Sequence, residues 1–386
     1  MKTYLLTGGT GFLGSHLAVE LMKRGDRIIF IGRSTENTPI QTRIKDVLSK
    51  LDPVFNLTNI ETIEGDITTT GLGLSDTSLQ NLNGKIDAIW HLAANLSFKK
   101  EDKNLVFITN TTGTQNVLEL AKILNCSFYY TSTAYVHGNR SGLVLEDELI
   151  YPTRGFNNYY EESKYLSEKF IHKYAQENKI NFIIFRPSIL INFNGNNGVK
   201  NFGYYAVVSA FFNFKMSLLK LIKENGFLSK ILGIKVKEEK LIIPIPFPYS
   251  HKTHLNLIPI NHTVKWMMDI SSNSSAIDKT FHIVNPNPSS IKTLLDQVIT
   301  ALNIEMPLFK SRGWQTRFCF DIFYTIGKIV KSVRKISSRL HTFKYYMTSD
   351  NKYDIKNIKM ILGEQAIEQL NTDSTSMQKM VKTFTE

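Results

Sequence analysis

Residues 3–14, Thr-Tyr-Leu-Leu-Thr-Gly-Gly-Thr-Gly-Phe-Leu-Gly, decide the fold of this 386-residue chain. The apolar run at 3–7 predicts a strand that leads directly into a glycine-rich turn. From Phe12 to Lys23 apolar residues recur at helical spacing, and a second apolar run follows at 28–31. The order strand, turn, helix, strand predicts one parallel strand–helix–strand unit at the start of the chain.

The glycines of this turn have different expected roles. Gly8 allows the tight turn, Gly11 lets the backbone approach a pyrophosphate, and Gly14 lets the helix pack closely on the strand. Phosphates would lie at the helix N-terminus, where free N–H groups and the helix dipole favour anions. A plain glycine-rich turn is the alternative, and the flanking strands argue against it. The predicted cofactor-binding set in the loop is Gly8, Thr10, Gly11, Phe12, Leu13 and Gly14.

Strand and helix signals continue to alternate along the first half of the chain. Helical stretches are expected around 104–124 and 157–178. Further strands are expected at 60–63, 86–91, 127–131 and 181–185. This alternation predicts an α/β fold with a Rossmann-like, doubly wound parallel sheet that carries helices on both faces.

The alternation of strand and helix signals stops after Pro187, and strand signals return near 256–260 and 281–284. We therefore expect a nucleotide-binding domain and a smaller C-terminal substrate-binding region, between which the chain weaves. The expected domain boundaries are 1–190 with 251–285 for the nucleotide-binding domain, and 191–250 with 286–386 for the substrate-binding region.

The second strand ends at Ile31-Gly32-Arg33, where an acidic residue would hold the ribose 2′-hydroxyl of NAD. A guanidinium group there can instead hold a 2′-phosphate through a planar, bidentate contact. Arg33 therefore predicts NADPH as the cofactor, with Arg43 as a second cation. The alternative is that both arginines are exposed residues of a solvated loop.

A tyrosine and a lysine one helical turn apart form a second functional signal. Tyr160 and Lys164 lie in a stretch that is expected to open a helix, so the two side chains share a face. An ammonium group beside the phenol would move the pKa of Tyr160 below its ordinary value near 10 and aid proton transfer. Thr133 follows a predicted strand at the edge where open α/β sheets bind ligands. We expect Thr133, Tyr160 and Lys164 to be catalytic; otherwise Thr133 caps a loop and Tyr160 packs on its helix.

Several motifs together resemble the extended short-chain dehydrogenases/reductases. They are TGGTGFLG at 7–14, TSTAYVHG at 131–138, YYEESK at 159–164 and RPSIL at 186–190. A narrower set resembles the thioester-reductase and fatty acyl-CoA reductase branch, the male-sterility type of NAD-binding domain. It comprises GDI at 65–67, LGLS at 72–75, IWHLAA at 89–94, NTTGT at 110–114 and STAYV at 132–136. The resemblance fades after about residue 300, and Gly32 stands where the branch often has an apolar residue.

The resemblance implies an activity and further site residues. It implies an NADPH-dependent reductase that turns an acyl thioester into an aldehyde, with reduction to the alcohol left open. It carries over the catalytic set Thr133, Tyr160 and Lys164 together with the pyrophosphate glycines and Arg33. It also places Asp66 at the adenine with Ile67 in the same cofactor set, Ala93 along the cofactor, and Pro187 with Ser188 near the nicotinamide.

The chain is basic, with a net charge of +12. Nine of its basic residues lie in the segment 310–344 against one acidic residue, Asp321. This segment suits the phosphates of coenzyme A or an acyl carrier protein. Its alternation of aromatic, aliphatic and basic residues also fits an interfacial helix on a membrane surface, or a solvated face over core aromatics. No nucleic acid is expected as a partner, because no recognised binding module accompanies the charge.

Two cysteines, Cys126 and Cys319, form neither a disulfide framework nor a metal cluster, so no metal is expected. The N-terminus enters a strand without a leader pattern, and the uncharged run at 201–214 is short for a membrane span. A cytoplasmic location is expected, with association at a membrane surface as the alternative.

Two other functions compete with the thioester reductase. An extended dehydrogenase, epimerase or dehydratase on a nucleotide sugar or sterol-like alcohol is the first, and the STAYV and LGLS features argue against it. A non-catalytic NADP-binding sensor or scaffold is the second. Intact Thr133, Tyr160 and Lys164 argue against it, because a sensor has no use for a proton donor aimed at a carbonyl.

Overall fold

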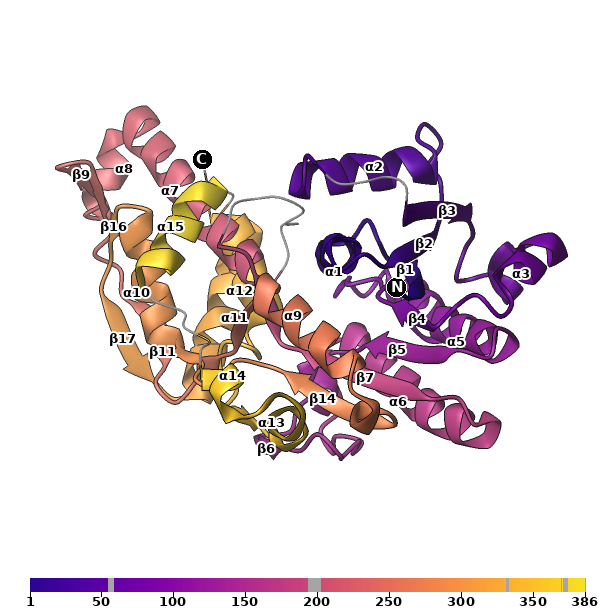
Figure 1. Cartoon of the computed structure of the whole chain (residues 1–386). Helices are drawn as coiled ribbons and strands as arrows, with labels where there is room; N and C mark the ends of the chain where they lie inside the picture. The colour runs from indigo at the N-terminus through magenta and orange to yellow at the C-terminus, as the bar shows by residue number, and fades with distance from the viewer. Residues whose placement is uncertain (55–58, 194–202, 331–332, 369, 371–373, 386) are drawn as a thin grey trace. The chain divides into compact units, whose positions relative to one another are not determined.

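The computed structural model describes the whole chain except residues 55–58, 194–202, 331–332, 369, 371–373 and 386 (Figure 1). The chain divides into two compact units. Unit 1 comprises Met1–Ser188, Ile260–Pro286 and Tyr353–Gln369. Unit 2 comprises Ile189–Pro259, Asn287–Lys352 and Leu370–Glu386.

Unit 1 is built on a seven-stranded sheet in which every neighbouring pair of strands is parallel. Its strands are β1 (Thr3–Thr7), β2 (Arg27–Gly32), β3 (Ile60–Glu64), β4 (Ala88–His91), β5 (Ser127–Thr131), β7 (Phe182–Pro187) and β14 (Lys279–Ile283). Their order is β14-β7-β5-β4-β1-β2-β3, so the direction of winding reverses between β1 and β4. Ligands of such sheets bind outside the carboxyl ends of the strands at this switch point. The predicted Rossmann-like, doubly wound sheet is confirmed.

Helices cover both faces of this sheet. Those of unit 1 are α1 (Phe12–Lys23), α2 (Ile40–Leu51), α3 (Asp76–Leu82), α4 (Lys103–Phe107), α5 (Gly113–Ile123), α6 (Tyr159–Asn178), α9 (Ile260–Ser271), α13 (Lys356–Leu362) and α14 (Glu364–Glu368). Alternate strand residues such as Leu5, Ile89 and Phe128 form a buried core with α5 and α6. The residues between them, such as Leu6 and Trp90, point to the other face, where α1 packs against α2 and α9 (Figure 1).

Short turns and one small strand complete unit 1. They are η2 (Thr70–Gly73), η3 (Ile108–Thr112), η4 (Ala134–His137), η5 (Ser274–Ala276) and β6 (Gly142–Val144). The helical stretch predicted around 104–124 is confirmed as α4, η3 and α5, where η3 is a π-helical turn between the two α-helical segments. In this turn the side chain of Asn110 accepts the N–H of Asn95, and the backbone carbonyl of Asn110 accepts the hydroxyl of Thr114.

The unit boundaries differ from the predicted ones by one or two residues near 189 and 286, and by longer segments at two places. Residues 251–259 were expected in the nucleotide-binding domain, but they belong to unit 2, where β13 (Leu257–Pro259) pairs with β8 (Ile189–Ile191). Tyr353–Gln369 was expected in the C-terminal region, but it belongs to unit 1. There the buried carboxylate of Glu146 accepts the backbone N–H of Asn357 at 2.5 Å, which ties this late segment to the sheet domain.

Unit 2 combines small sheets with long helices. Its helices are α7 (Tyr204–Glu224), α8 (Gly226–Ile231), α10 (Ile291–Ala301), α11 (Gly313–Ile329), α12 (Arg334–Phe343) and α15 (Ser374–Thr385). Its other strands are β9 (Lys235–Lys237), β10 (Lys240–Ile242), β11 (Phe247–Ser250), β12 (His254–Leu255), β15 (Ser289–Ser290), β16 (Ile304–Glu305) and β17 (Leu308–Ser311), with β18 (Asn351–Tyr353) at the unit boundary.

Among the described residues, one helix is long and apolar enough to cross a membrane by length and composition alone. This helix is α7, which extends beyond the uncharged run at 201–214 and contains an 18-residue stretch with a mean hydropathy of 1.3. Core helices of globular proteins pass the same test, so the finding is weak evidence for a span.

Candidate active site

The glycine-rich turn joins the end of β1 to the start of α1. Gly8 has a φ of 79°, and a Cβ atom there would lie 2.5 Å from the backbone nitrogen of Ala93, which follows β4. A Cβ atom at Gly14 would lie 2.3 Å from the carbonyl oxygen of Gly8. Only glycine therefore lets α1 and the Ala93 segment approach this turn so closely. The turn brings two predicted cofactor segments, one after β1 and one after β4, into contact.

The N-terminus of α1 is suited to an anion. Gly11 is its N-cap residue, no side chain caps the helix, and its first turn contains no acidic residue. The first N–H groups of a helix have no partner inside it, so a pyrophosphate satisfies them well. Thr10 and Phe12 are half-buried and Leu13 is nearly buried, so the loop presents backbone rather than long side chains. The residues present fit the pyrophosphate of a dinucleotide.

Arg33, Arg43 and Asp66 meet where β2 and β3 end. Arg33 Nη1 lies 3.3 Å from Asp66 Oδ2, and Arg43 donates to the carbonyl oxygen of Arg33. Burial raises the pKa of Asp66, but hydrogen bonds from Thr68 and the charge of Arg33 lower it overall. The predicted 2′-phosphate cation therefore stands next to an ionised carboxylate.

Glu64 supports this corner and was missed from the sequence. Its carboxylate accepts hydrogen bonds from the N–H and the hydroxyl of Ser34, which hold the loop after Arg33. The hydrogen bonds lower the pKa of Glu64. The one sequence signal is an acidic residue at the end of a predicted strand, which is too common to single it out.

The other predicted cofactor residues occupy the same edge of the sheet. Ala93 follows β4, while Pro187 ends β7 and Ser188 donates its N–H to Ile283 at the end of β14. Ile67 packs against Gly113, where a Cβ atom would lie 2.9 Å from its Cδ1. Because β7, β5, β4 and β1 are neighbours in that order, their carboxyl ends form one continuous rim.

Thr133 and Tyr160 are brought together at this rim. Asn158 caps α6 by accepting the N–H of Glu161 at 2.9 Å, which starts the helix just before Tyr160. Thr133 lies close enough to Tyr160 for its side chain to lower the pKa of the phenol. Thr133 also caps η4 by accepting the N–H of Tyr135 at 3.2 Å. The alternative role predicted for Thr133, capping a loop, is therefore present as well as its contact with Tyr160.

Lys164 reaches the same segment from one turn further along α6. Its Nζ donates to the carbonyl oxygen of Thr131 at 2.7 Å and lies 4.6 Å from the ring centre of Tyr130. The side chain is nearly fully buried. Burial lowers the pKa of Lys164 to about 7, and the charge of Glu168 opposes this effect.

The predicted fall in the pKa of Tyr160 is wrong. Burial raises this pKa well above its ordinary value, the bond with Thr133 lowers it, and Glu161 raises it further. Lys164 directs its amine to a backbone carbonyl and is itself only partly charged near neutral pH. Desolvation of the phenolate therefore dominates the pKa of Tyr160. Tyr160 is a neutral phenol at pH 7.

Asn110 is a further site residue for which the sequence predicted no role. It lies in the π-helical turn η3 and is fully buried. Its side chain accepts the N–H of Asn95 at 2.7 Å and donates to Ser163 at 2.9 Å. Its carbonyl accepts the hydroxyl of Ser167 at 2.8 Å. Asn110 thus fixes α6 against the segment after β4, and its signal was the NTTGT motif.

A buried ion pair underlies the site. Arg186, at the end of β7, places Nη2 2.7 Å and Nε 3.0 Å from the carboxylate of Glu168 on α6. Arg186 also donates to the backbone carbonyls of Leu145, Glu146 and Glu148. Both charges are paired and hydrogen-bonded, as burial requires. The pair holds α6 against β7.

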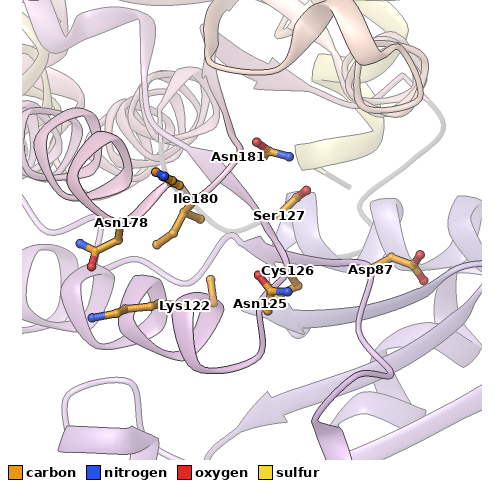
Figure 2. Close-up of a pocket in the computed structure, with 10 residues that line it drawn as sticks. Asp87, Lys122, Asn125, Cys126, Ser127, Asn178, Ile180 and Asn181 are labelled. Atoms are coloured by element: carbon orange, nitrogen blue, oxygen red, sulfur yellow. The ribbon is translucent and has the colours of Figure 1, made fainter.

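A polar pocket lies at the amino ends of the strands, opposite the rim. Figure 2 shows its lining residues, which precede β4, β5 and β7 and include Asp87, Lys122, Cys126 and Asn181. Burial raises the pKa of the Cys126 thiol to about 12, so this thiol is not activated. The pocket therefore contributes nothing to the rim described above. In the part of the chain that the structure describes, no three His, Cys, Asp or Glu side chains are grouped to hold a metal ion.

Comparison with known proteins places these features in a family. The family model described as Male sterility protein, an NAD-binding domain, matches residues 6–267. A putative fatty acyl-CoA reductase of Drosophila melanogaster is 31% identical over 157 residues, which is 38% of this chain and 28% of the fly protein. A nonribosomal peptide synthetase of Aspergillus flavus is 26% identical over 388 residues, which is 93% of this chain and 34% of the synthetase.

Solved structures agree in fold. The terminal R domain from the myxalamid PKS-NRPS biosynthetic pathway superposes with a TM-score of 0.75 at 22% identity, covering 100% of this chain and 89% of that domain. A UDP-glucuronic acid 4-epimerase from Bacillus cereus in complex with NAD superposes with a TM-score of 0.64 at 18% identity, covering 99% of this chain and 96% of the epimerase.

The chain matches less than half the length of each of these two curated relatives. The family model, in contrast, spans well over half of this chain. The male sterility protein family comprises NAD-binding oxidoreductase domains of the extended short-chain dehydrogenase/reductase fold and includes the fatty acyl-CoA reductases. This chain, which carries the rim of cofactor and tyrosine–lysine residues, belongs to that family.

Proposed function

We propose that this chain reduces an acyl thioester to an aldehyde with NADPH, and that the acyl group is carried on coenzyme A or an acyl carrier protein. One observation carries the proposal. At the rim of the unit 1 sheet the neutral phenol of Tyr160 lies next to Thr133, while Lys164 donates to the carbonyl oxygen of Thr131, the last residue of β5. Relatives named as a fatty acyl-CoA reductase and a nonribosomal peptide synthetase support the choice of a thioester.

The chemistry requires a proton donor at the carbonyl oxygen. A thioester carbonyl that gains a hydride becomes an oxyanion, and aimed hydroxyl groups stabilise it. Because Tyr160 is protonated at neutral pH, its O–H donates to this oxygen and supplies the proton. Thr133 orients Tyr160 and offers a second hydroxyl. The hemithioacetal that results expels the thiol and leaves the aldehyde.

Lys164 has a positioning role in this proposal. Its amine holds the carbonyl of Thr131, two residues before Thr133. This bond fixes the end of β5 and thereby the place of Thr133 relative to Tyr160. The same amine is assigned to the nicotinamide ribose, as the family resemblance implies.

The cofactor supplies the hydride when bound. Gly8, Gly11 and Gly14 would hold its pyrophosphate at the start of α1, where the backbone has no side-chain cap. The choice of NADPH over NADH rests on Arg33, whose side chain is 66% exposed at the end of β2. Its partner Asp66 is the competing feature, because a carboxylate at this corner also suits the 2′-hydroxyl of NAD.

The test is a panel of acyl-CoA and acyl carrier protein donors with NADPH or NADH. Loss of reduced-cofactor absorbance together with release of free thiol is expected. The Tyr160→Phe variant should bind NADPH and lose turnover by a factor of roughly 10² to 10⁴, the typical contribution of a general acid. Tyr159→Phe is the matched control, because Tyr159 precedes it on α6 and packs near Phe107 and Lys103.

Several results would contradict the proposal. Full turnover in the Tyr160→Phe variant would remove the proton donor from the mechanism. Tight cofactor binding without consumption on any thioester would favour a sensor. Net reduction of oxidised cofactor with a nucleotide sugar or a sterol-like alcohol would favour the dehydrogenase alternative, and isomerisation of a nucleotide sugar without net cofactor consumption would favour the epimerase.

A further inference from the structure

The positive charge of the chain belongs to unit 2. This unit holds 22 Lys and Arg residues and 9 Asp and Glu residues, a net charge of +13. Unit 1 holds 24 basic and 25 acidic residues, a net charge of −1. A site of acyl thioester chemistry in unit 1 does not explain why the excess lies entirely in the other unit. The basic segment 310–344 is part of unit 2, and its Lys331 lies outside the described residues.

Helix α11 in this segment has an apolar face that the described chain leaves in solvent. Its large side chains recur at intervals of three or four residues, so they form one stripe along the helix. Each of them is between 45% and 82% exposed. The stripe consists of Trp314, Phe318, Ile322, Ile326 and Ile329. At 17 residues, the helix that carries it is about 25 Å long.

The opposite face of α11 is also apolar. Phe320 and Gly327 are buried there, and a Cβ atom at Gly327 would lie 1.9 Å from the hydroxyl of Ser337 on α12. This close approach packs α11 onto α12. One apolar face of α11 is covered by α12, and the other remains in solvent. An exposed apolar face of this kind is typical of a surface that binds a partner or a membrane.

The charged side chains of α11 contact other residues and lie outside the stripe. Arg317 donates to Thr348 at 3.1 Å, and Asp321 accepts from Lys344 at 2.5 Å. Lys328 lies 5.0 Å from the ring centre of Tyr324. The charges are therefore engaged along the flank of the helix, and the stripe is free to enter an apolar medium.

The neighbouring helix α12 supplies exposed cations. Its apolar residues Ile336 and Leu340 are buried, whereas Lys335 and Arg339 are exposed. We propose that the α11 stripe and these cations bind the surface of an anionic lipid bilayer, with the stripe among the acyl chains and the cations at the phosphates. This combination of an apolar face and a basic flank is how interfacial helices bind membranes. The proposal does not depend on the reductase activity.

Charge favours a bilayer over a second copy of the chain as the occupant of the stripe. A second copy of the chain would bring two units of net charge +13 together, which opposes association. An acidic protein partner would use the same cations, and the experiments below distinguish it from a bilayer. A bilayer needs only the apolar face and the cations.

The first test is sedimentation with vesicles of phosphatidylcholine alone or with phosphatidylserine added. Binding is expected only with phosphatidylserine, and Ile322→Glu should weaken the partition by roughly tenfold or more. Ile123→Glu is the matched control, because Ile123 on α5 is 49% exposed and Ile322 is 46% exposed. Equal losses in both variants, or none in Ile322→Glu, would overturn the proposal.

Tryptophan fluorescence provides a second, independent readout. The chain has three tryptophans, of which Trp90 and Trp266 are buried and Trp314 is 58% exposed at the start of the stripe. Anionic vesicles should shift the emission to the blue, and Trp314→Phe should abolish the shift while the protein still sediments with vesicles. Sedimentation without a shift would mean that charge alone holds the protein at the surface, which refutes insertion of the stripe. A shift with an acidic carrier protein and none with vesicles would refute the bilayer in favour of a protein partner.

Discussion

Replacing Lys164 with methionine is expected to stabilise the folded protein at neutral pH while it abolishes turnover. Burial lowers the pKa of Lys164 from 10.5 to about 7. Between these values the unfolded lysine binds a proton that the folded one has lost, so the free energy of unfolding rises with pH across this window. Relative to a permanently neutral side chain, Lys164 costs the folded state roughly 4 kcal/mol at about pH 7 and roughly 2 kcal/mol at about pH 9.

Methionine also removes a hydrogen bond. The carbonyl of Thr131 loses its donor, which costs about 1–3 kcal/mol at any pH. The Lys164→Met variant should therefore be more stable than the wild type by roughly 1–3 kcal/mol at about pH 7. The advantage should shrink by roughly 2 kcal/mol by about pH 9.

The assay is urea unfolding at a series of pH values, followed by circular dichroism, with no cofactor added. Lys169→Met on the same helix is the matched control, because Lys169 is exposed and its replacement should leave a difference that does not change with pH. If the difference between Lys164→Met and wild type stays constant from neutral to alkaline pH, the buried lysine does not titrate as argued and the reasoning is refuted.

Three further predictions concern cofactor binding and the core. Gly14→Ala should weaken NADPH binding by roughly 10- to 100-fold in a fluorescence titration, because its Cβ would clash with the carbonyl of Gly8 and overpacking costs about 1–3 kcal/mol. Arg33→Ala should raise the KM for NADPH by about tenfold or more and leave that for NADH nearly unchanged, since a charge-assisted bond is worth about 1.5–3 kcal/mol; an unchanged NADPH KM would sink the assignment. Glu168→Gln should lower stability in calorimetry by about 3–5 kcal/mol, because it strands the charge of Arg186, and a loss under 1 kcal/mol would contradict this.

The sequence predicted the elements whose signals are local. The glycines of the first turn, the apolar strands and the Tyr160–Lys164 spacing are each readable within a few residues, and the parallel sheet follows from their alternation. The boundary at residue 259 was missed because the partner strand β8 lies some 70 residues earlier, a pairing that no local pattern reveals.

The errors at the candidate site have a common physical cause. Spacing alone shows that Lys164 and Tyr160 share a helix face, but the pKa of Tyr160 depends on how completely the phenol is removed from water. Likewise, Asn110 acts through contacts with Asn95 and Ser163, which are distant in sequence. Burial and long-range partners are properties of the folded chain. Sequence spacing does not contain them.

The division of the chain has a consequence for its synthesis. The polypeptide passes between the two units five times, and β14, the edge neighbour of β7, ends about 95 residues after β7. At a ribosomal rate of about 5–20 residues per second, the outer edge of β7 waits roughly 5–20 s for its partner. During this interval a nascent apolar strand offers unpaired backbone groups to any other chain nearby. Chaperone demand during translation should therefore peak before residue 283 emerges, and a fragment ended at residue 190 should aggregate rather than fold.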